Sequence, residues 1–236
     1  MSKRRNDRHK ETLAEKAYER IKRSILRGEF EEGTFLSESE ILRNFGIGRT
    51  PFREACNRLH HEQLLEWVPR RGYLVPEISL RAVRELMEVR LILEGVVAEL
   101  AALRHQPKEA EELAAILQSS AINGGTSDSE QVVSANTDFH RCLARMTHNR
   151  ELVRLVEGLL DRHERVAYLE QRTAGLRKAD IRNWHVPIVE AVKNRDSQKA
   201  REAVLSDIVQ GKIDIFGKLD WHTGRSEVQP SDPNNT

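Results

Sequence analysis

The chain has 236 residues, of which 39% are hydrophobic and 32% are charged, and its formal net charge at pH 7 is +1. This length exceeds that of a typical single domain, so we expect two compact units. No apolar run could span a bilayer, the first residues lack the apolar core of a signal peptide, and the two cysteines lie in unrelated segments, which excludes a membrane protein and favours the reducing cytoplasm.

Helical periodicity predicts three helices in the first 61 residues, where basic residues exceed acidic ones. The first runs from Ala14 to Leu26 and is stopped by Gly28. A capping-box pattern in Ser37–Glu40 predicts a short second helix that ends at Gly46. After a glycine turn, a third helix is expected to run to about His61. Two short helices joined in this way are typical of a helix-turn-helix.

The third helix and the segment after it predict a DNA-reading surface. Thr50 and Pro51 look like the N-cap and first-turn proline of the third helix. Residues 64–68 and 73–75 read as two strands of a hairpin, which would form a wing. Arginine can donate two hydrogen bonds to guanine in the major groove, and a glycine at a basic hairpin tip allows a close approach to the backbone or minor groove. The predicted DNA contacts are Arg49, Thr50, Arg53, Asn57, Arg70, Arg71 and Gly72.

An ordinary solvated helix and a charged hairpin would explain any one of these features alone, but not their order and spacing.

Beyond residue 79 the periodicity predicts six helices, at about 80–105, 107–120, 129–147, 149–172, 175–195 and 197–218. Residues 123–128 read as a loop between helices, and the polar residues 221–236 as a disordered tail.

The helix expected from residue 80 carries charge within its apolar stripe. Arg90 lies in line with Leu86 and Val97, and Glu94 follows one turn later. One interpretation is an internal ion pair at helical spacing, and the other is an arginine that awaits an anionic effector. The residues alone leave both interpretations open, and they make Arg90 and Glu94 candidates for effector binding.

Four more polar residues lie on apolar helix faces: Asn136, His140, His185 and Asp207. Each one alone would more often be a core residue that hydrogen-bonds to a neighbouring helix. Four such residues on three helices indicate a cluster of groups that can bind metal and that point inward.

The N-terminal third resembles the GntR family through two segments, 36–42 (LSESEIL) and 45–55 (FGIGRTPFREA). The resemblance implies a winged helix-turn-helix over residues 10–76 that binds a double-stranded operator. Two residues depart from the family pattern. Gly48 stands where a hydroxyl residue is usual, and Gln63 stands where a glycine commonly follows the recognition helix. A phosphate-binding hydroxyl is therefore missing.

The rest of the chain resembles the FCD effector-binding domain of the FadR subfamily, through residues 88–90, 136–140, 148–149 and 185–191. The resemblance implies a mainly α fold in which the winged helix-turn-helix is followed by an all-helical antiparallel bundle over residues 79–220. It also implies a homodimer that regulates transcription, in most cases as a repressor.

By position, the metal ligands of that subfamily correspond to Asn136, His140, His185 and Asp207. Two of the four differ in type from the subfamily pattern, and the set keeps two imidazoles and two oxygen ligands. Such a site suits a divalent metal, zinc first, with nickel, manganese or iron as alternatives. A metal together with Arg90 could hold a small carboxylate effector. The alternative is a metal-dependent hydrolytic enzyme built on the same cluster, with Glu94 or Asp138 as base, but no catalytic motif supports it.

Overall fold

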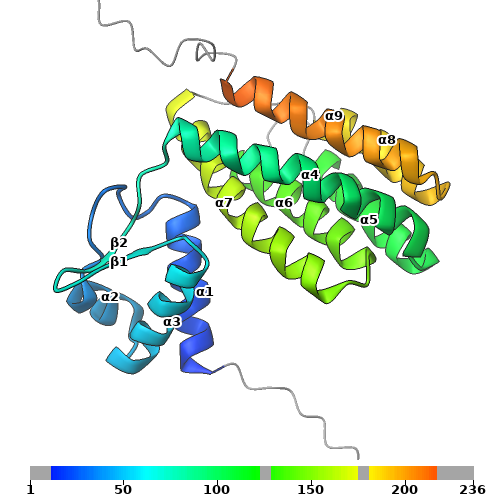
Figure 1. The fold of residues 1–236 in the computed structure, drawn as a ribbon. Helices are drawn as coiled ribbons and strands as arrows, with labels where there is room; N and C mark the ends of the chain where they lie inside the picture. The colour runs from blue at the N-terminus through cyan, green and yellow to red at the C-terminus, as the bar shows by residue number, and fades with distance from the viewer. Residues whose placement is uncertain (1–11, 123–128, 175–180, 217–236) are drawn as a thin grey trace, which may run out of the picture.

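The structure, a computed structural model, describes residues 12–122, 129–174 and 181–216. A small unit of three helices and a hairpin lies beside a larger helical unit (Figure 1). The elements are α1 Leu13–Leu26, α2 Glu38–Phe45, α3 Arg49–His61, β1 Glu66–Val68, β2 Gly72–Leu74, α4 Leu80–Arg104, α5 Pro107–Ile122, α6 Ser129–Met146, α7 Arg150–Ala174, α8 Ile181–Lys193 and α9 Ser197–Phe216. The predicted mainly α fold with an N-terminal winged helix-turn-helix is confirmed. The predicted loop 123–128, the tail 221–236 and the start of the helix expected at 175 lie outside the described residues.

The N-terminal unit, which we call the head, is held together by α1 packing on α3. A capping box between Thr12 and Glu15, which the sequence analysis missed, starts α1. The antiparallel strands pair Trp67 with Tyr73, and the Tyr73 ring meets Phe52 of α3 edge-on at 6.2 Å. The hairpin is thereby fixed against α3.

Two helix starts differ from the sequence prediction. Thr50 is not the N-cap of α3, because the extended Gly48 carbonyl already accepts the first helical hydrogen bond, from the Phe52 amide at 3.2 Å. Ser37 is the N-cap of α2, as its position suggested, but its side chain makes no capping hydrogen bond. Both helices therefore begin without a side-chain cap, and Thr50 lies within α3.

The first hairpin strand is also shorter than predicted. Leu64 and Leu65 are fully buried but lie outside β1, because their amides donate to the carbonyl of Leu59 at 2.9 and 3.3 Å and so complete the end of α3. Gln63 reverses the chain direction there with a φ of 62°. This is the left-handed region that glycine adopts most readily, which explains why a glycine is usual at this position.

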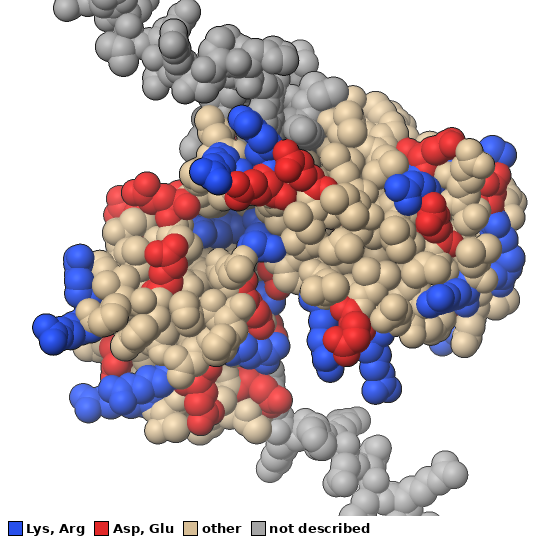
Figure 2. Space-filling model, viewed as in Figure 1, with Lys and Arg blue, Asp and Glu red and all other residues tan. Residues whose placement is uncertain are grey.

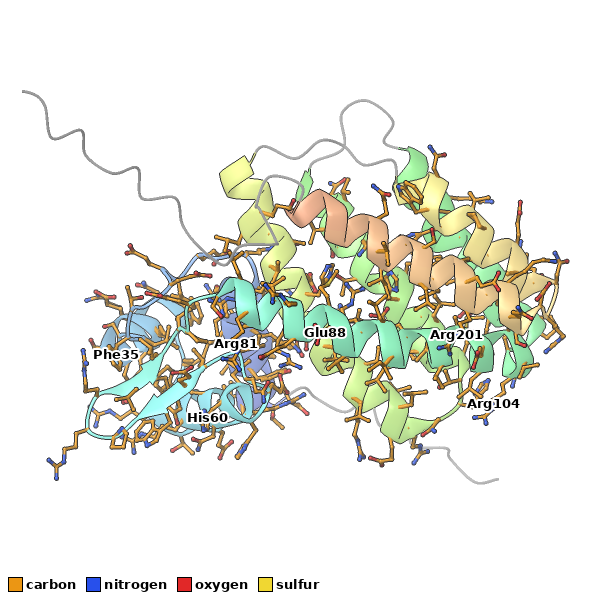
Figure 3. The ribbon with its side chains drawn as sticks, turned by 45° about the horizontal axis from the view of Figure 1, so that its top comes forward. Phe35, His60, Arg81, Glu88, Arg104 and Arg201 are labelled. Carbon is orange, nitrogen blue, oxygen red and sulfur yellow. The ribbon has the colours of Figure 1, made fainter. Side chains whose placement is uncertain are left out.

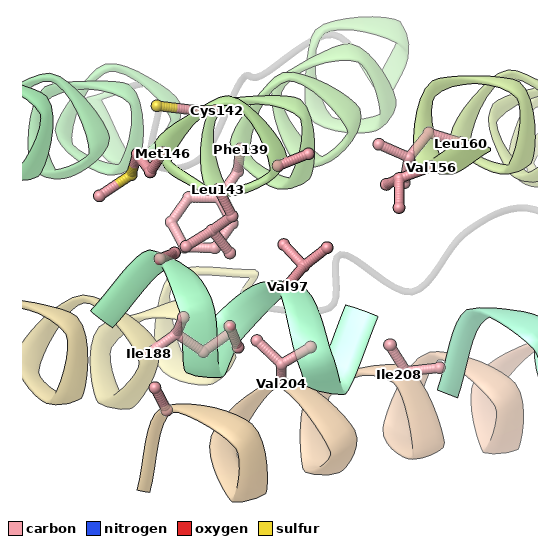
Figure 4. Packing of buried hydrophobic residues seen from close by; sticks show 14 of the residues in the cluster. Val97, Phe139, Cys142, Leu143, Met146, Val156, Leu160, Ile188, Val204 and Ile208 are labelled. Carbon is pink, nitrogen blue, oxygen red and sulfur yellow. The ribbon is translucent and has the colours of Figure 1, made fainter. Parts of the chain in front are cut away.

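In the larger unit α4 lies in the middle, with α9 on one side and α6 and α7 on the other. Figure 4 shows the apolar core where these helices meet, with Val97 of α4 facing Leu143 of α6 and Val204 of α9. Within the described ranges no helix is both long and apolar enough to cross a membrane. The bundle thus brings polar groups on four helices within reach of one another.

The two units touch through α1 and α7. Lys22 of α1 donates to Asp161 of α7 at 2.6 Å, and Asp161 also accepts from Arg141 of α6 at 2.6 Å. Farther along α7, Arg165 donates to Glu32 at 3.0 Å. These ion pairs join the head to the helical unit.

Candidate functional site

The first turns of α3 present two arginines at the outer end of the head. The side chains of Arg49 and Arg53 are 78% and 66% exposed, and each lies 3.5–4.0 Å from the carboxylate of Glu38. Thr50, between them in sequence, is also exposed. In Figure 2 basic side chains project from the left edge, where Figure 1 places the hairpin tip and α2. The two guanidinium groups therefore share one exposed surface beside the carboxylate of Glu38.

A groove between α3 and the hairpin brings four of the predicted DNA contacts together: Arg53, Asn57, Arg71 and Gly72. The Asn57 amide oxygen accepts from the Tyr73 hydroxyl at 2.6 Å, which fixes the orientation of the amide. The Arg71 guanidinium stacks 4.1 Å above the ring of Phe35. At Gly72 φ is +101° and nothing lies within 4 Å of the place where a Cβ would be.

Arg70 is exposed at the hairpin turn with a φ of 65°. Because both Arg70 and Gly72 have positive φ, the turn is tight and leaves the backbone at Gly72 accessible. The basic tip of the hairpin and the start of α3 can then approach one nucleic-acid backbone together. This arrangement supports the predicted set of DNA contacts.

In the helical unit, Arg90 and Glu94 of α4 form a buried ion pair. Arg90 Nε donates to Glu94 Oε1 at 2.6 Å, and both side chains are 2% exposed. Burial raises the pKa of Glu94, but the positive charge of Arg90 and the contact with His140 outweigh this effect and lower it overall. The structure thus forms the internal ion pair that was one of the two interpretations of this stripe.

Three further groups meet beside this pair: His140 of α6, His185 of α8 and Asp207 of α9. One ligand atom from each lies within 4.8 Å of the other two. His140 Nε2 is 3.2 Å and His185 Nε2 is 3.5 Å from the Asp207 carboxylate. The Phe139 ring stacks on the His185 ring at 3.9 Å and holds it in place.

The ring nitrogens of this cluster lack proper hydrogen bonds. Both nitrogens of His140 and Nε2 of His185 are buried and have no hydrogen-bond partner among the residues that the structure describes. His140 Nδ1 nevertheless lies 2.7 Å from Glu94 Oε2, so the two form an ion pair when the ring is protonated. Unpartnered buried polar atoms are rare and costly. A cation bound by Nε2 of His140, Nε2 of His185 and the Asp207 carboxylate would satisfy these two nitrogens, so the three residues fit a metal.

The two imidazoles of the cluster differ in charge. Burial lowers the pKa of His185 to about 4, which keeps the ring neutral, the form that binds metal. Burial also lowers the pKa of His140, but Glu94 and Asp207 outweigh it and raise that pKa to about 9. Without a metal, Arg90 and the protonated His140 balance the carboxylates of Glu94 and Asp207, and a divalent cation would bind His140 in exchange for that proton.

Asn136, the fourth predicted ligand, lies one turn before His140 on α6 and is half-buried. Its amide hydrogen-bonds to none of the described residues. His163 of α7 was missed by the sequence analysis although it is buried beside the cluster. Burial, and then the charge of Arg90, lower the pKa of His163 well below its usual value. Its place in the apolar stripe of Val156, Leu160 and Val166 is the signal that marked the other histidines, and it could have been found in the same way.

Comparison with known families divides the chain in two. The family of bacterial regulatory proteins called gntR matches residues 13–75, and the FCD domain family matches residues 85–209. The first match covers the head, and the second covers the helices that carry the cluster.

Individual proteins agree with the family matches. An uncharacterized HTH-type transcriptional regulator, YdhC of Bacillus subtilis, is 30% identical over 80% of this chain and 84% of its own length. The Uxu operon regulator of Haemophilus influenzae is 30% identical over 87% of this chain and 84% of its own length. Among solved structures, E. coli McbR/YncC has a TM-score of 0.78 at 22% identity and covers 88% of this chain and 98% of its own, which shows a shared fold.

Proposed function

The chain belongs to the GntR family of bacterial transcription regulators and carries an FCD domain, and from this premise we propose that it is a repressor controlled by an organic acid bound at a metal. A gluconate operon repressor of Bacillus licheniformis, 24% identical over 85% of this chain, supports repression as the mode of action. The site of action is the cytoplasm. The hydrolytic alternative is not retained, because the matching families and these relatives are transcription regulators.

The operator is read by the surface of α3 and the wing. Arg53 and Asn57 reach base edges in the major groove, while Arg49 and Thr50 at the start of α3 bind phosphate. Arg70, Arg71 and Gly72 approach the backbone or minor groove. The shared groove that holds Arg53, Asn57, Arg71 and Gly72 supports this assignment.

The observation that carries the regulatory part of the proposal is the buried set of unpartnered imidazole nitrogens beside Asp207. His140, His185 and Asp207 would hold a divalent metal, with Asn136 as the fourth ligand. Zinc is the first expectation, and nickel, manganese and iron are the alternatives. When bound, the metal would supply a positive centre that attracts a carboxylate.

Arg90 is the second group proposed to bind that carboxylate. Its contacts with Glu94 and with the Met87 sulfur involve two of its five N–H donors. The hydrogen bond to Glu94 holds the guanidinium of Arg90 in place. The proposed effector is therefore a small organic acid bound between metal and arginine.

A homodimer is proposed from the outer face of α4. Val89, Ile92, Val96 and Leu103 recur there at helical spacing, and Ile92 is 65% exposed. In Figure 3 the same helix runs from Arg81 beside the head to Arg104 at the far end. A second copy of this face would cover the apolar side chains and set the distance between two heads.

The test is metal analysis and operator binding on the same preparations. We expect the wild-type dimer to contain about one metal per chain and the His140→Ala/His185→Ala variant to contain none. A DNA duplex selected from a random pool by the wild type should bind the double variant, but without a response to added metal. The Arg53→Ala variant, with its metal intact, should bind that duplex with an affinity lower by about tenfold or more. A wild type that takes up no metal after supplementation would contradict the metal site and leave DNA binding untouched.

A further inference from the structure

A second cavity lies where the head meets the helical unit, separate from the metal cluster. It has a volume of about 420 Å³, within the range of small-molecule sites, and such sites favour domain junctions. Its apolar wall comes from both units: Leu64, Leu65, Ile78, Val83, Leu86 and Val166. Figure 3 labels His60 of α3 and Arg81 of α4 near the place where the two units meet, and Arg81 directly precedes the lining residue Ala82. We call this cavity the junction pocket.

The charged groups at the junction pocket are unequally partnered. Arg165 is paired with Glu32 at 3.0 Å. The Glu77 carboxylate lies against Gly33, since a Cβ added there would be 3.0 Å from Glu77 Oε1. Glu66 is exposed on β1. Arg162, by contrast, donates within the described part of the chain to neutral acceptors, the Gly158 carbonyl at 3.3 Å and the Gln63 side-chain oxygen.

Arg162 therefore has no carboxylate partner among the described residues, although it is half-buried. Burial alone lowers the pKa of its guanidinium. A partly desolvated cation without a counter-ion is unfavourable unless a ligand supplies the negative charge. Arginine is suited to this role because it can donate two parallel hydrogen bonds to one carboxylate.

Gln63 adds an independent observation from the head. Its φ of 62° is costly for a residue with a side chain, and such strain is kept where the surroundings favour it. Here the side-chain oxygen accepts from Arg162 across the junction. Gln63 thus holds the guanidinium at the mouth of the junction pocket, which a glycine at this position could not do.

We propose that the junction pocket is a second ligand site that binds an amphipathic monocarboxylate, with the carboxylate on Arg162 and an alkyl chain against the leucine and valine wall. The charge of Arg162 selects the anion and the apolar wall selects the tail. The ligand would contact α3, the wing, α4 and α7 together, so its binding would fix the head against the helical unit. This site is independent of the metal cluster and of its effector.

The probe is octanoate, titrated calorimetrically into the metal-loaded full chain. We expect saturable binding of octanoate, while acetate, which has the charge without the tail, does not saturate over the same range. 1-Octanol, which has the tail without the charge, should bind at least tenfold more weakly. Arg162→Gln should also weaken the binding of octanoate by about tenfold or more, as expected for loss of a hydrogen-bonded charge.

Two further variants locate the ligand. Ala82→Phe places a ring in the junction pocket from an exposed position and should abolish octanoate binding without unfolding the protein. Arg154→Gln removes an exposed arginine of the same helix outside the pocket, and it should bind like the wild type. His140→Ala/His185→Ala should keep the wild-type affinity within twofold. Unchanged binding by Ala82→Phe, loss of binding in the histidine variant alone, or no binding by the wild type would overturn the proposal.

Discussion

At the scale of single residues, the buried pair of Arg90 and Glu94 makes a measurable prediction. Glu94→Gln keeps the shape of the side chain but leaves the guanidinium of Arg90 without its counter-charge in a buried site. Removing one partner of a buried ion pair typically costs about 3–5 kcal/mol. We expect the free energy of unfolding, measured by urea denaturation, to fall by about 3 kcal/mol.

The matched control is Glu85→Gln on the same helix. Glu85 pairs with Arg81 at the same spacing and at 2.8 Å, but both side chains are exposed. Such pairs contribute about 0–1 kcal/mol, because water screens them and their side chains lose entropy. Equal losses in the two variants would mean that burial of the Arg90–Glu94 pair does not govern its contribution.

At the scale of helices and strands, the outer face of α4 predicts the oligomeric state. Ile92→Glu places a charge in the middle of the proposed dimer face, where it would be desolvated without a partner. We expect the variant to sediment as a monomer at concentrations where the wild type is a dimer, with unchanged helix content.

Leu155→Glu is the control for this face. Leu155 is exposed on α7 to nearly the same extent, 59%, but is not among the apolar residues that recur on α4. It should remain a dimer. A monomeric Leu155→Glu together with a dimeric Ile92→Glu would place the interface on α7 instead.

The same scale shows what the sequence could predict. The bounds of α4, α6 and α9 followed from periodicity within the described residues, because each helix has an apolar face and clear breakers. The predicted start of α3 was wrong. Thr50 has a side chain typical of an N-cap, but the Gly48 carbonyl accepts the first helical hydrogen bond. Leu64 and Leu65 were assigned to a strand because they are apolar. Buried residues at the end of a helix are apolar for the same reason.

The polar cluster shows a different limit. Helix periodicity predicted that His140 and His185 lie on inward faces. It could not predict their distance from Asp207, because that distance depends on how three helices pack. The orientation of Arg90 toward Glu94 was one of two open interpretations, because spacing alone does not determine a side-chain conformation. The contact between Gln63 and Arg162 joins residues 99 positions apart and had no sequence signal.

At the scale of the whole molecule, α7 connects the cluster to the head. His163 of α7 is buried beside Arg90 and the ligand residues. Two positions earlier on the same helix, Asp161 accepts hydrogen bonds from Lys22 of the head and from Arg141. A shift of α7 that follows metal or effector binding would therefore move the contact that holds α1. An effector can regulate only if it favours one such arrangement over another.

Asp161→Asn tests this route from the cluster to the head. The variant loses the charge that pairs with Lys22 and Arg141, yet keeps every proposed metal ligand, so its metal content should match that of the wild type.

In the wild type, removing metal with a chelator should change the Kd for the selected duplex by about fivefold or more, the usual size of an allosteric coupling. In Asp161→Asn that ratio should decrease, because α7 loses its ion pair with α1, while the contacts that Arg165 and Arg162 make with the head within the described residues remain. Glu157 of α7 lines one cleft together with Lys22 and Asp161 but forms no ion pair within the described residues, so Glu157→Gln should keep the wild-type ratio. An undiminished ratio in Asp161→Asn would show that the signal reaches the head by another path, such as the linker of residues 75–79 between β2 and α4.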